Sequence, residues 1–103
     1  MLKHIVAFAA ALACLAAPAL AAGDIKAGKK KALQCQTCHG MDGLSKLPEA
    51  PNLAGQTEVY LAKAFTDFKT GERKNDMMSL VAPTASEQDI ADLAAYYSSL
   101  KAE

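Results

Sequence analysis

The sequence predicts a small all-α protein with three main helices. Apolar residues recur at the helical spacing i, i+3, i+4 and i+7 in two segments, 57–70 and 86–100. A third segment, 25–33, follows Asp24, a residue type that often caps the N-terminus of a helix. No stretch shows the alternation of apolar and polar residues that is typical of strands.

The first helix is expected to run from Ile25 to about Leu33, with Asp24 as its N-cap. Gly28 lies inside this helix, where a glycine costs about 1 kcal/mol relative to alanine. A packing reason is therefore expected, such as the close approach of another helix. We expect that neighbour to be the last helix, with Tyr96 or Tyr97 over Gly28.

The second helix is expected to begin at Thr57 and continue to about Thr70, with Gly71 ending it. Its apolar stripe consists of Leu61, Ala64, Phe65 and Phe68. Ser86 caps the last helix, and Asp89 three residues on completes an imperfect capping box. The stripe of this helix consists of Leu93, Tyr96, Tyr97 and Leu100.

The segment between the first two helices contains Cys35-Gln36-Thr37-Cys38-His39, which reads C-x-x-C-H. This pattern is the attachment signature of a c-type haem. Two thiols at this spacing can both form thioethers with one edge of a porphyrin, and the histidine that follows can give an imidazole nitrogen to iron. The three helices and their loops are therefore expected to wrap around one covalently attached haem c.

Other interpretations of the two cysteines are weaker. A zinc site needs four protein ligands, and no cysteine or histidine follows His39. A thioredoxin-like redox pair is typical of a βαβ pattern, which this sequence lacks. Two buried structural cysteines in a helical domain remain as the third possibility.

Residues 1–21 have the features of a secretory signal peptide. A short basic start is followed by an apolar run from Ile5 to Leu20, which ends in the small-x-small sequence Ala19-Leu20-Ala21. The run is shorter than the roughly 20 apolar residues of a membrane-spanning helix. Cys14 is expected to leave with the signal, because Leu12 is misplaced for a lipoprotein site. We expect a periplasmic domain of residues 22–103.

The domain that remains is small for a single hydrophobic core. Chains of this length usually need an additional stabilising element. Both remaining cysteines are assigned to haem attachment, so the cofactor itself is expected to have this role. We therefore expect the chain without haem to be unfolded or molten.

The net charge is close to neutral, with ten basic and eleven acidic residues once Lys3 is removed. This balance argues against a nucleic-acid partner, which favours a basic excess. Lysines nevertheless gather ahead of the C-x-x-C-H motif, at Lys26, Lys29, Lys30 and Lys31. They indicate either a solvated helix face or a patch that steers an acidic redox partner.

Two loops contain candidate residues for the surroundings of the iron. A ligating histidine needs an acceptor for its other ring nitrogen, and the carbonyl of Pro51 is the candidate, with Pro48 as competitor. A methionine pair, Met77 and Met78, lies in a polar loop that we expect to be non-helical. A thioether is a soft neutral ligand for haem iron, so either methionine can be the sixth ligand. Met41 follows His39 too closely to reach the opposite face.

These motifs together resemble a class I c-type cytochrome, of the short bacterial monohaem type that is similar to one half of the periplasmic dihaem cytochromes c. The similarity spans the whole chain after the signal peptide and rests on segments 24–28, 35–40, 51–56, 60–61, 73–78 and 86–96. The resemblance implies the class I cytochrome c fold, with crossed terminal helices that meet at Gly28 and Tyr96. It also implies His39 as proximal ligand, the Pro51 carbonyl as its hydrogen-bond acceptor, and Met78 rather than Met77 as sixth ligand.

The resemblance implies a periplasmic electron-transfer protein rather than an enzyme, with redox proteins as partners and no stable membrane insertion. One alternative is the haem subunit of a larger redox enzyme, such as a flavoprotein sulfide dehydrogenase. A weaker alternative is a sensor or peroxidase with an open coordination position, which would require that neither Met77 nor Met78 binds.

Overall fold

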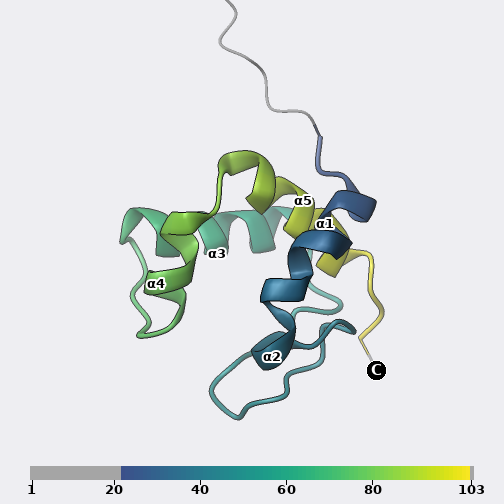
Figure 1. Ribbon diagram of the computed structural model, residues 1–103, viewed down its shortest axis with the longest axis horizontal. Coiled ribbons are helices and arrows are strands. Elements are labelled where there is room, and N and C mark those ends of the chain that lie inside the picture. The colour runs from purple at the N-terminus through teal and green to yellow at the C-terminus, as the bar shows by residue number, and fades with distance from the viewer. Residues whose placement is uncertain (1–21, 103) are drawn as a thin grey trace, which may run out of the picture.

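A computed structural model of the chain describes residues 22–102, and these residues form helices and no strands (Figure 1). The predicted signal peptide, residues 1–21, lies outside the described residues. The α-helices are α1 (Ile25–Lys31), α2 (Gln36–His39), α3 (Glu58–Thr70), α4 (Met78–Val81) and α5 (Glu87–Ser98). Two 3₁₀ turns, Ala32–Gln34 and Ala82–Thr84, follow α1 and α4. The predicted all-α fold with three longer helices is confirmed.

Helix α1 begins as expected but ends earlier. The Asp24 side chain accepts hydrogen bonds from the backbone N–H groups of Lys26 and Ala27. The α-helix ends at Lys31 and tightens into the 3₁₀ turn, so the prediction of an α-helix to about Leu33 was two residues too long. This turn leads directly into α2, a single helical turn that the sequence pattern did not predict.

Helices α1 and α5 pack closely because α1 presents glycine to α5. A Cβ atom at Gly28 would lie 2.0 Å from the Asp92 carbonyl oxygen and 2.7 Å from the Tyr96 Cβ. No side chain fits in that space, so the expected close contact between Gly28 and Tyr96 is confirmed. Figure 1 shows α1 and α5 adjacent, with α4 at a separate corner of the molecule.

An ion pair also joins α1 to α5. The Lys31 Nζ lies 2.5 Å from Asp92 Oδ2 and 2.8 Å from Asp89 Oδ1. Asp92 is 2% exposed, and its Oδ1 accepts hydrogen bonds from the Asp24 backbone N–H and the Gln88 amide, both at 2.9 Å. The hydrogen bond from Lys31 lowers the pKa of Asp92 to about 2. Lys31 therefore does not belong to an unpaired lysine patch, which corrects that part of the expectation.

The ends of α3 and α5 follow their local sequence signals. Thr57 caps α3 by accepting from the Tyr60 N–H, and Gly71 ends this helix with a φ of 87°. The capping box of α5 has both hydrogen bonds, because the shorter Asp89 side chain still reaches the Ser86 N–H at 2.9 Å. These helices and the turn after α1 enclose the core cluster Ala32, Leu61, Leu93, Ala94, Tyr96 and Tyr97.

Candidate haem-binding site

Both predicted attachment cysteines lie on or beside α2. Cys35 immediately precedes this turn and Cys38 lies within it; both are half-buried free thiols. Residues three apart on a helical turn share one face, so the two sulfurs are presented together. Burial raises the pKa of the Cys35 thiol, which keeps it protonated at neutral pH.

His39 is held in one orientation and one tautomer. Its ring is buried, and Nδ1 lies 2.9 Å from the carbonyl oxygen of Pro51. A carbonyl can only accept, so Nδ1 carries the proton and Nε2 keeps the lone pair that binds a metal. The acceptor is the carbonyl of Pro51, which the sequence analysis named as the candidate, and not that of Pro48.

The loop that provides Pro51 is closed by the carbonyl of Gly43. This oxygen accepts from the backbone N–H groups of Leu53 and Ala54 at 2.8 and 3.0 Å. The loop therefore returns towards α2, and the rigid backbone at proline places its carbonyl against the histidine ring.

The two methionines differ in burial and lie at the start of α4. Met78 is half-buried and is the first residue of α4, whereas Met77 is 58% exposed. The expectation of a non-helical loop was wrong for Met78. The Asn75 side chain accepts from the N–H groups of both methionines at 3.0 Å and so starts the helical turn.

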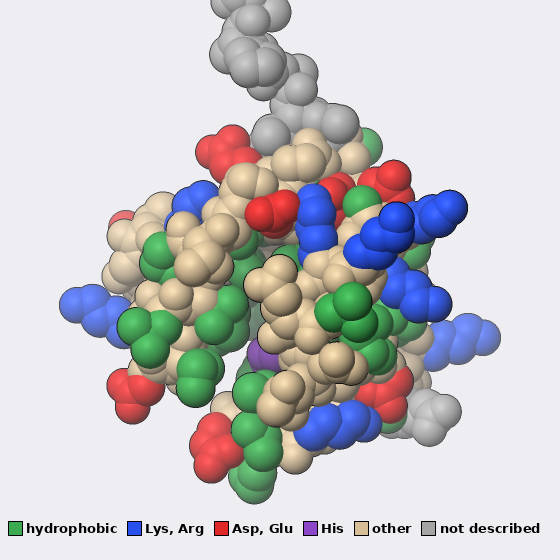
Figure 2. All heavy atoms as spheres, in the orientation of Figure 1, with side chains coloured by type: hydrophobic (Ala, Val, Ile, Leu, Met, Phe, Trp, Pro, Cys, Tyr) green, Lys and Arg blue, Asp and Glu red, His purple; other side chains and the backbone are tan. Residues whose placement is uncertain are grey.

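Figure 2 shows a hollow between two groups of hydrophobic side chains, with histidine atoms on its wall. His39 is the one histidine among residues 22–102. A smaller cavity of about 80 Å³ next to Cys35 has both apolar lining residues, such as Phe65 and Leu93, and polar ones, such as Lys31 and Asp89. The two cysteines, the unprotonated Nε2 and the apolar walls are what an attached porphyrin needs, so these residues fit a haem.

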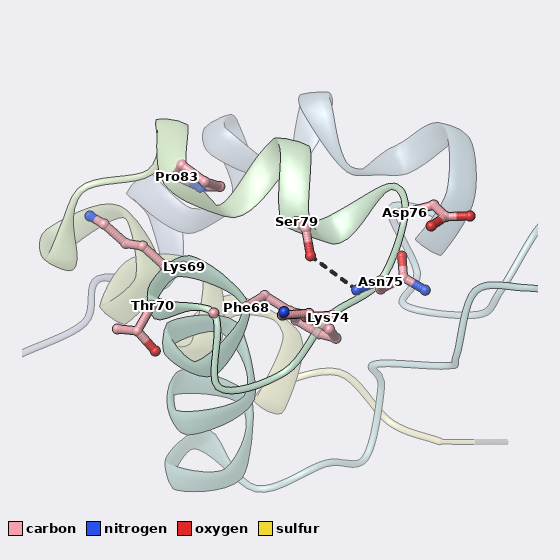
Figure 3. Close-up of a pocket in the computed structure, with 9 residues that line it drawn as sticks. Phe68, Lys69, Thr70, Lys74, Asn75, Asp76, Ser79 and Pro83 are labelled. Carbon is pink, nitrogen blue, oxygen red and sulfur yellow. Dashed lines mark hydrogen bonds between the residues drawn. The ribbon is translucent and has the colours of Figure 1, made fainter.

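A larger groove of about 590 Å³ lies elsewhere, between the end of α3 and α4 (Figure 3). Its lining includes Phe68, Lys74 and Asn75, and the Asn75 N–H donates to the Ser79 hydroxyl at 3.0 Å. The groove has no cysteine or histidine on its wall. Over residues 22–102, no group of three or more His, Cys, Asp or Glu side chains is placed to hold a metal ion. The groove is therefore not a second candidate for the iron site.

Residues 25–101 match the family model described as Cytochrome c, and the chain belongs to this family. Family membership implies a covalently bound haem c, and Cys35 and Cys38 have the spacing of its attachment motif. The predicted class of protein, its fold and its cofactor are thereby confirmed.

Three relatives place the chain within the family. It is 49% identical to cytochrome c4 of Pseudomonas aeruginosa over 79% of this chain and 40% of the relative. It is 46% identical to cytochrome c-554(548) of Halomonas halodenitrificans over 76% of this chain and 98% of the relative. The crystal structure of reduced cytochrome c4 from Pseudomonas stutzeri superposes with a TM-score of 0.72 at 44% identity, covering 78% of this chain and 47% of that one. The chain thus spans less than half of the cytochrome c4 relatives and nearly all of the shorter one.

Sequence reasoning missed two kinds of contact around this site. It gave no role to Asp92, although this carboxylate is the centre of the α1–α5 ion pair. It also treated Tyr96 and Tyr97 only as apolar packing residues. Both phenol groups donate hydrogen bonds to the backbone that follows His39. Two adjacent tyrosines on a buried face were the available signal, because a buried phenol needs an acceptor.

Proposed function

We propose that the chain is a periplasmic electron-transfer protein with one haem c attached to Cys35 and Cys38 and axial ligands from His39 and Met78. The observation that carries this proposal is the hydrogen bond from His39 Nδ1 to Pro51, which leaves Nε2 free to bind iron beside the two cysteines. When bound, the haem supplies an iron that accepts and releases one electron.

Met78 is preferred over Met77 because of where the two side chains lie. Met78 is half-buried, whereas more than half of Met77 is exposed to solvent. A neutral thioether at the sixth position favours the ferrous state and raises the reduction potential. If His39 and Met78 both held the iron, no position would be left for a substrate, which would suit an electron carrier rather than an enzyme.

Visible spectra of the holoprotein test the ligand assignment, with Met77→Ala as the matched control for Met78→Ala. We expect a weak far-red band in the ferric wild type that is lost in Met78→Ala and kept in Met77→Ala. Loss of the band in Met77→Ala alone would assign the sixth ligand to Met77. A wild type without the band, whose ferrous form readily binds carbon monoxide, would contradict the carrier function and support a sensor or peroxidase.

The outer face of α1 is a candidate surface for an acidic redox partner. Lys26, Lys29 and Lys30 are exposed there, next to Ile25 and Leu33, which are 52% and 59% exposed. Figure 2 shows several basic side chains close to hydrophobic ones on one side of the molecule. Basic groups that surround exposed apolar side chains can steer a negatively charged protein and then contact it.

Oxidation of the reduced protein by ferricyanide, an anionic oxidant, measures the effect of this face on association. We expect the double variant Lys29→Glu, Lys30→Glu to react several-fold more slowly at low salt, with the difference shrinking as ionic strength rises. The same variant should react faster with a cationic cobalt complex. Lys74→Glu, an exposed lysine in the loop after α3, is the control. Equal effects per reversed lysine in the two variants would exclude a special role for α1.

The proposed periplasmic location rests on the N-terminal segment. Export is inferred from residues 1–21, and within residues 22–102 no helix is long and apolar enough to cross a membrane.

The alternative of a haem subunit in a flavoprotein sulfide dehydrogenase is not favoured, because the relatives described above are themselves named as cytochromes. Stable co-purification with a flavoprotein from the native source would reverse this preference.

A further inference from the structure

Two adjacent tyrosines of α5 donate hydrogen bonds to consecutive carbonyl groups directly after His39. The Tyr97 hydroxyl lies 3.0 Å from the Gly40 oxygen, and the Tyr96 hydroxyl lies 2.6 Å from the Met41 oxygen. The two rings meet edge to face, with centroids 5.2 Å apart. They come from the opposite end of the chain, 55 or more residues away in sequence.

The backbone that receives these hydrogen bonds has an unusual conformation. Gly40 ends α2 with a φ of 74°, and a Cβ atom there would lie 2.6 Å from the Leu44 carbonyl oxygen. The chain thus turns sharply away from the helix at the residue after His39. The Gly40 carbonyl points out of the helical ladder, so its partner must come from another element.

The same segment continues to the acceptor of the His39 ring. From Gly40 the chain reaches Gly43, whose carbonyl closes the loop onto Leu53 and Ala54 and so places Pro51. The loop between His39 and Pro51 is therefore attached to α5 at its first two residues, and its other end holds the imidazole Nδ1. A shift of Gly40 or Met41 would change both the start of the loop and the direction of the ring.

The Tyr97 hydroxyl keeps the proton that it donates to the Gly40 carbonyl oxygen. The residue is 2% exposed, and burial raises its pKa well above the usual value for tyrosine. The phenol is therefore a proton donor at neutral pH.

We infer that Tyr97, assisted by Tyr96, is a positioning residue that fixes the orientation of the His39 imidazole through the Gly40–Met41 backbone. This inference rests on the proposed role of His39 as an iron ligand. A merely structural role of the tyrosines would affect folding alone, whereas a positioning role also changes the spectroscopic signature and potential of the folded holoprotein.

Phenylalanine substitutions remove the hydroxyl groups and keep the rings. In Tyr97→Phe holoprotein, we expect proton NMR of the ferric form to show a changed spread of the haem methyl resonances, and the reduction potential to shift. In the ferrous form, the His39 Nδ1 proton should exchange with solvent about fivefold faster, as expected for the loss of one hydrogen bond. Tyr96→Phe should show smaller changes in the same directions, because its acceptor lies one residue farther from His39.

Tyr60→Phe is the matched control, since this tyrosine is 50% exposed on α3. A Tyr97→Phe protein that is less stable but keeps the wild-type methyl resonances, potential and exchange rate would overturn the inference. If Tyr97→Phe does not accumulate with haem, Tyr96→Phe decides, and unchanged resonances in that variant overturn it. A wild type in which His39 is not an iron ligand would instead refute the proposed function, and this is seen from the wild-type spectra alone.

Discussion

The α1–α5 contact and the region around α4 differ in how completely protein side chains fill them. Between α1 and α5 there is no space for a Cβ atom at Gly28. Asp92, the one buried carboxylate among residues 22–102, has a partner on each of its oxygens. Around α4, Met77 and Leu80 are 58% and 72% exposed, and a hollow separates this region from α2 (Figure 2). The first region is packed through direct contacts between protein groups, whereas the second has the apolar walls of a cofactor site.

This difference indicates two sources of stability in one small domain. The terminal helices pack through direct contacts, and the segments that contain His39 and Met78 are expected to order around the haem. Substitutions in each region can separate the two contributions to the free energy of unfolding.

The largest effect is expected from removing the attachment sites in a Cys35→Ala, Cys38→Ala double variant without haem. Because few large side chains among residues 22–102 are fully buried, this chain should be unfolded or molten, with most of its helical circular dichroism and its cooperative thermal transition lost. The wild-type holoprotein measured in parallel is the reference. A near-native spectrum of the double variant would show that the α1–α5 contact suffices to fold the domain.

Gly28→Ala tests the close contact itself. A methyl group at this position meets the Asp92 carbonyl, so the two helices must move apart, at a cost of about 3 kcal/mol in the free energy of unfolding of the holoprotein. Denaturant titration followed by circular dichroism measures this value. Lys29→Ala, at an exposed position of the same helix, should change it by less than about 0.5 kcal/mol. Equal effects of the two substitutions would mean that α1 and α5 can separate without cost.

Asp92→Asn tests the electrostatic part of the same contact and should cost about 2 kcal/mol, since a buried, charge-assisted hydrogen bond to Lys31 is lost. The pKa of Asp92 is about 2 in the folded protein and about 3.9 in the unfolded chain. The stabilisation is therefore complete above about pH 4 and is lost as the pH falls towards 2.

Unfolding curves of the wild type and Asp92→Asn across this pH range check the prediction. The difference in free energy of unfolding between them should shrink on acidification. The exposed Asp76→Asn is the control, and its difference from the wild type should stay small at every pH. If the difference in free energy of unfolding between the wild type and Asp92→Asn does not depend on pH, the contribution of Asp92 is steric rather than electrostatic.

The smallest effect is expected at the start of α5. Ser86→Ala removes the side chain that accepts from the Asp89 N–H and should cost about 1 kcal/mol, whereas Ser86→Asp keeps a capping oxygen and should lose only a few tenths. Thermal unfolding of both variants gives the comparison. A similar loss in both would show that this helix end is held by packing on α3 rather than by its cap.

Local chemistry explains which features were predictable from the sequence by itself. Helix ends at Asp24, Thr57 and Ser86, the glycine at position 28 and the C-x-x-C-H motif all depend on residues within a few positions of one another. The capping side chains meet the backbone of their own turn, and the motif is defined by its spacing, so both can be read locally. Gly28 was recognised because a glycine inside a helix needs a packing reason, although the groups that it contacts lie on α5. The class of protein, the fold and the cofactor followed from these signals together with the family resemblance.

Only the tertiary structure decided the contacts between residues distant in the sequence. Lys31 and Asp92 are 61 residues apart, and Tyr97 is 57 residues from Gly40. A lysine needs an acidic partner and a buried hydroxyl needs a hydrogen-bond acceptor, but the chain has many carboxylates and carbonyl groups. The close packing of α1 on α5 determines which carboxylate lies next to Lys31. For this reason Lys31 was grouped with the other lysines ahead of the motif, and the tyrosine hydroxyl groups beside His39 were not recognised from the sequence.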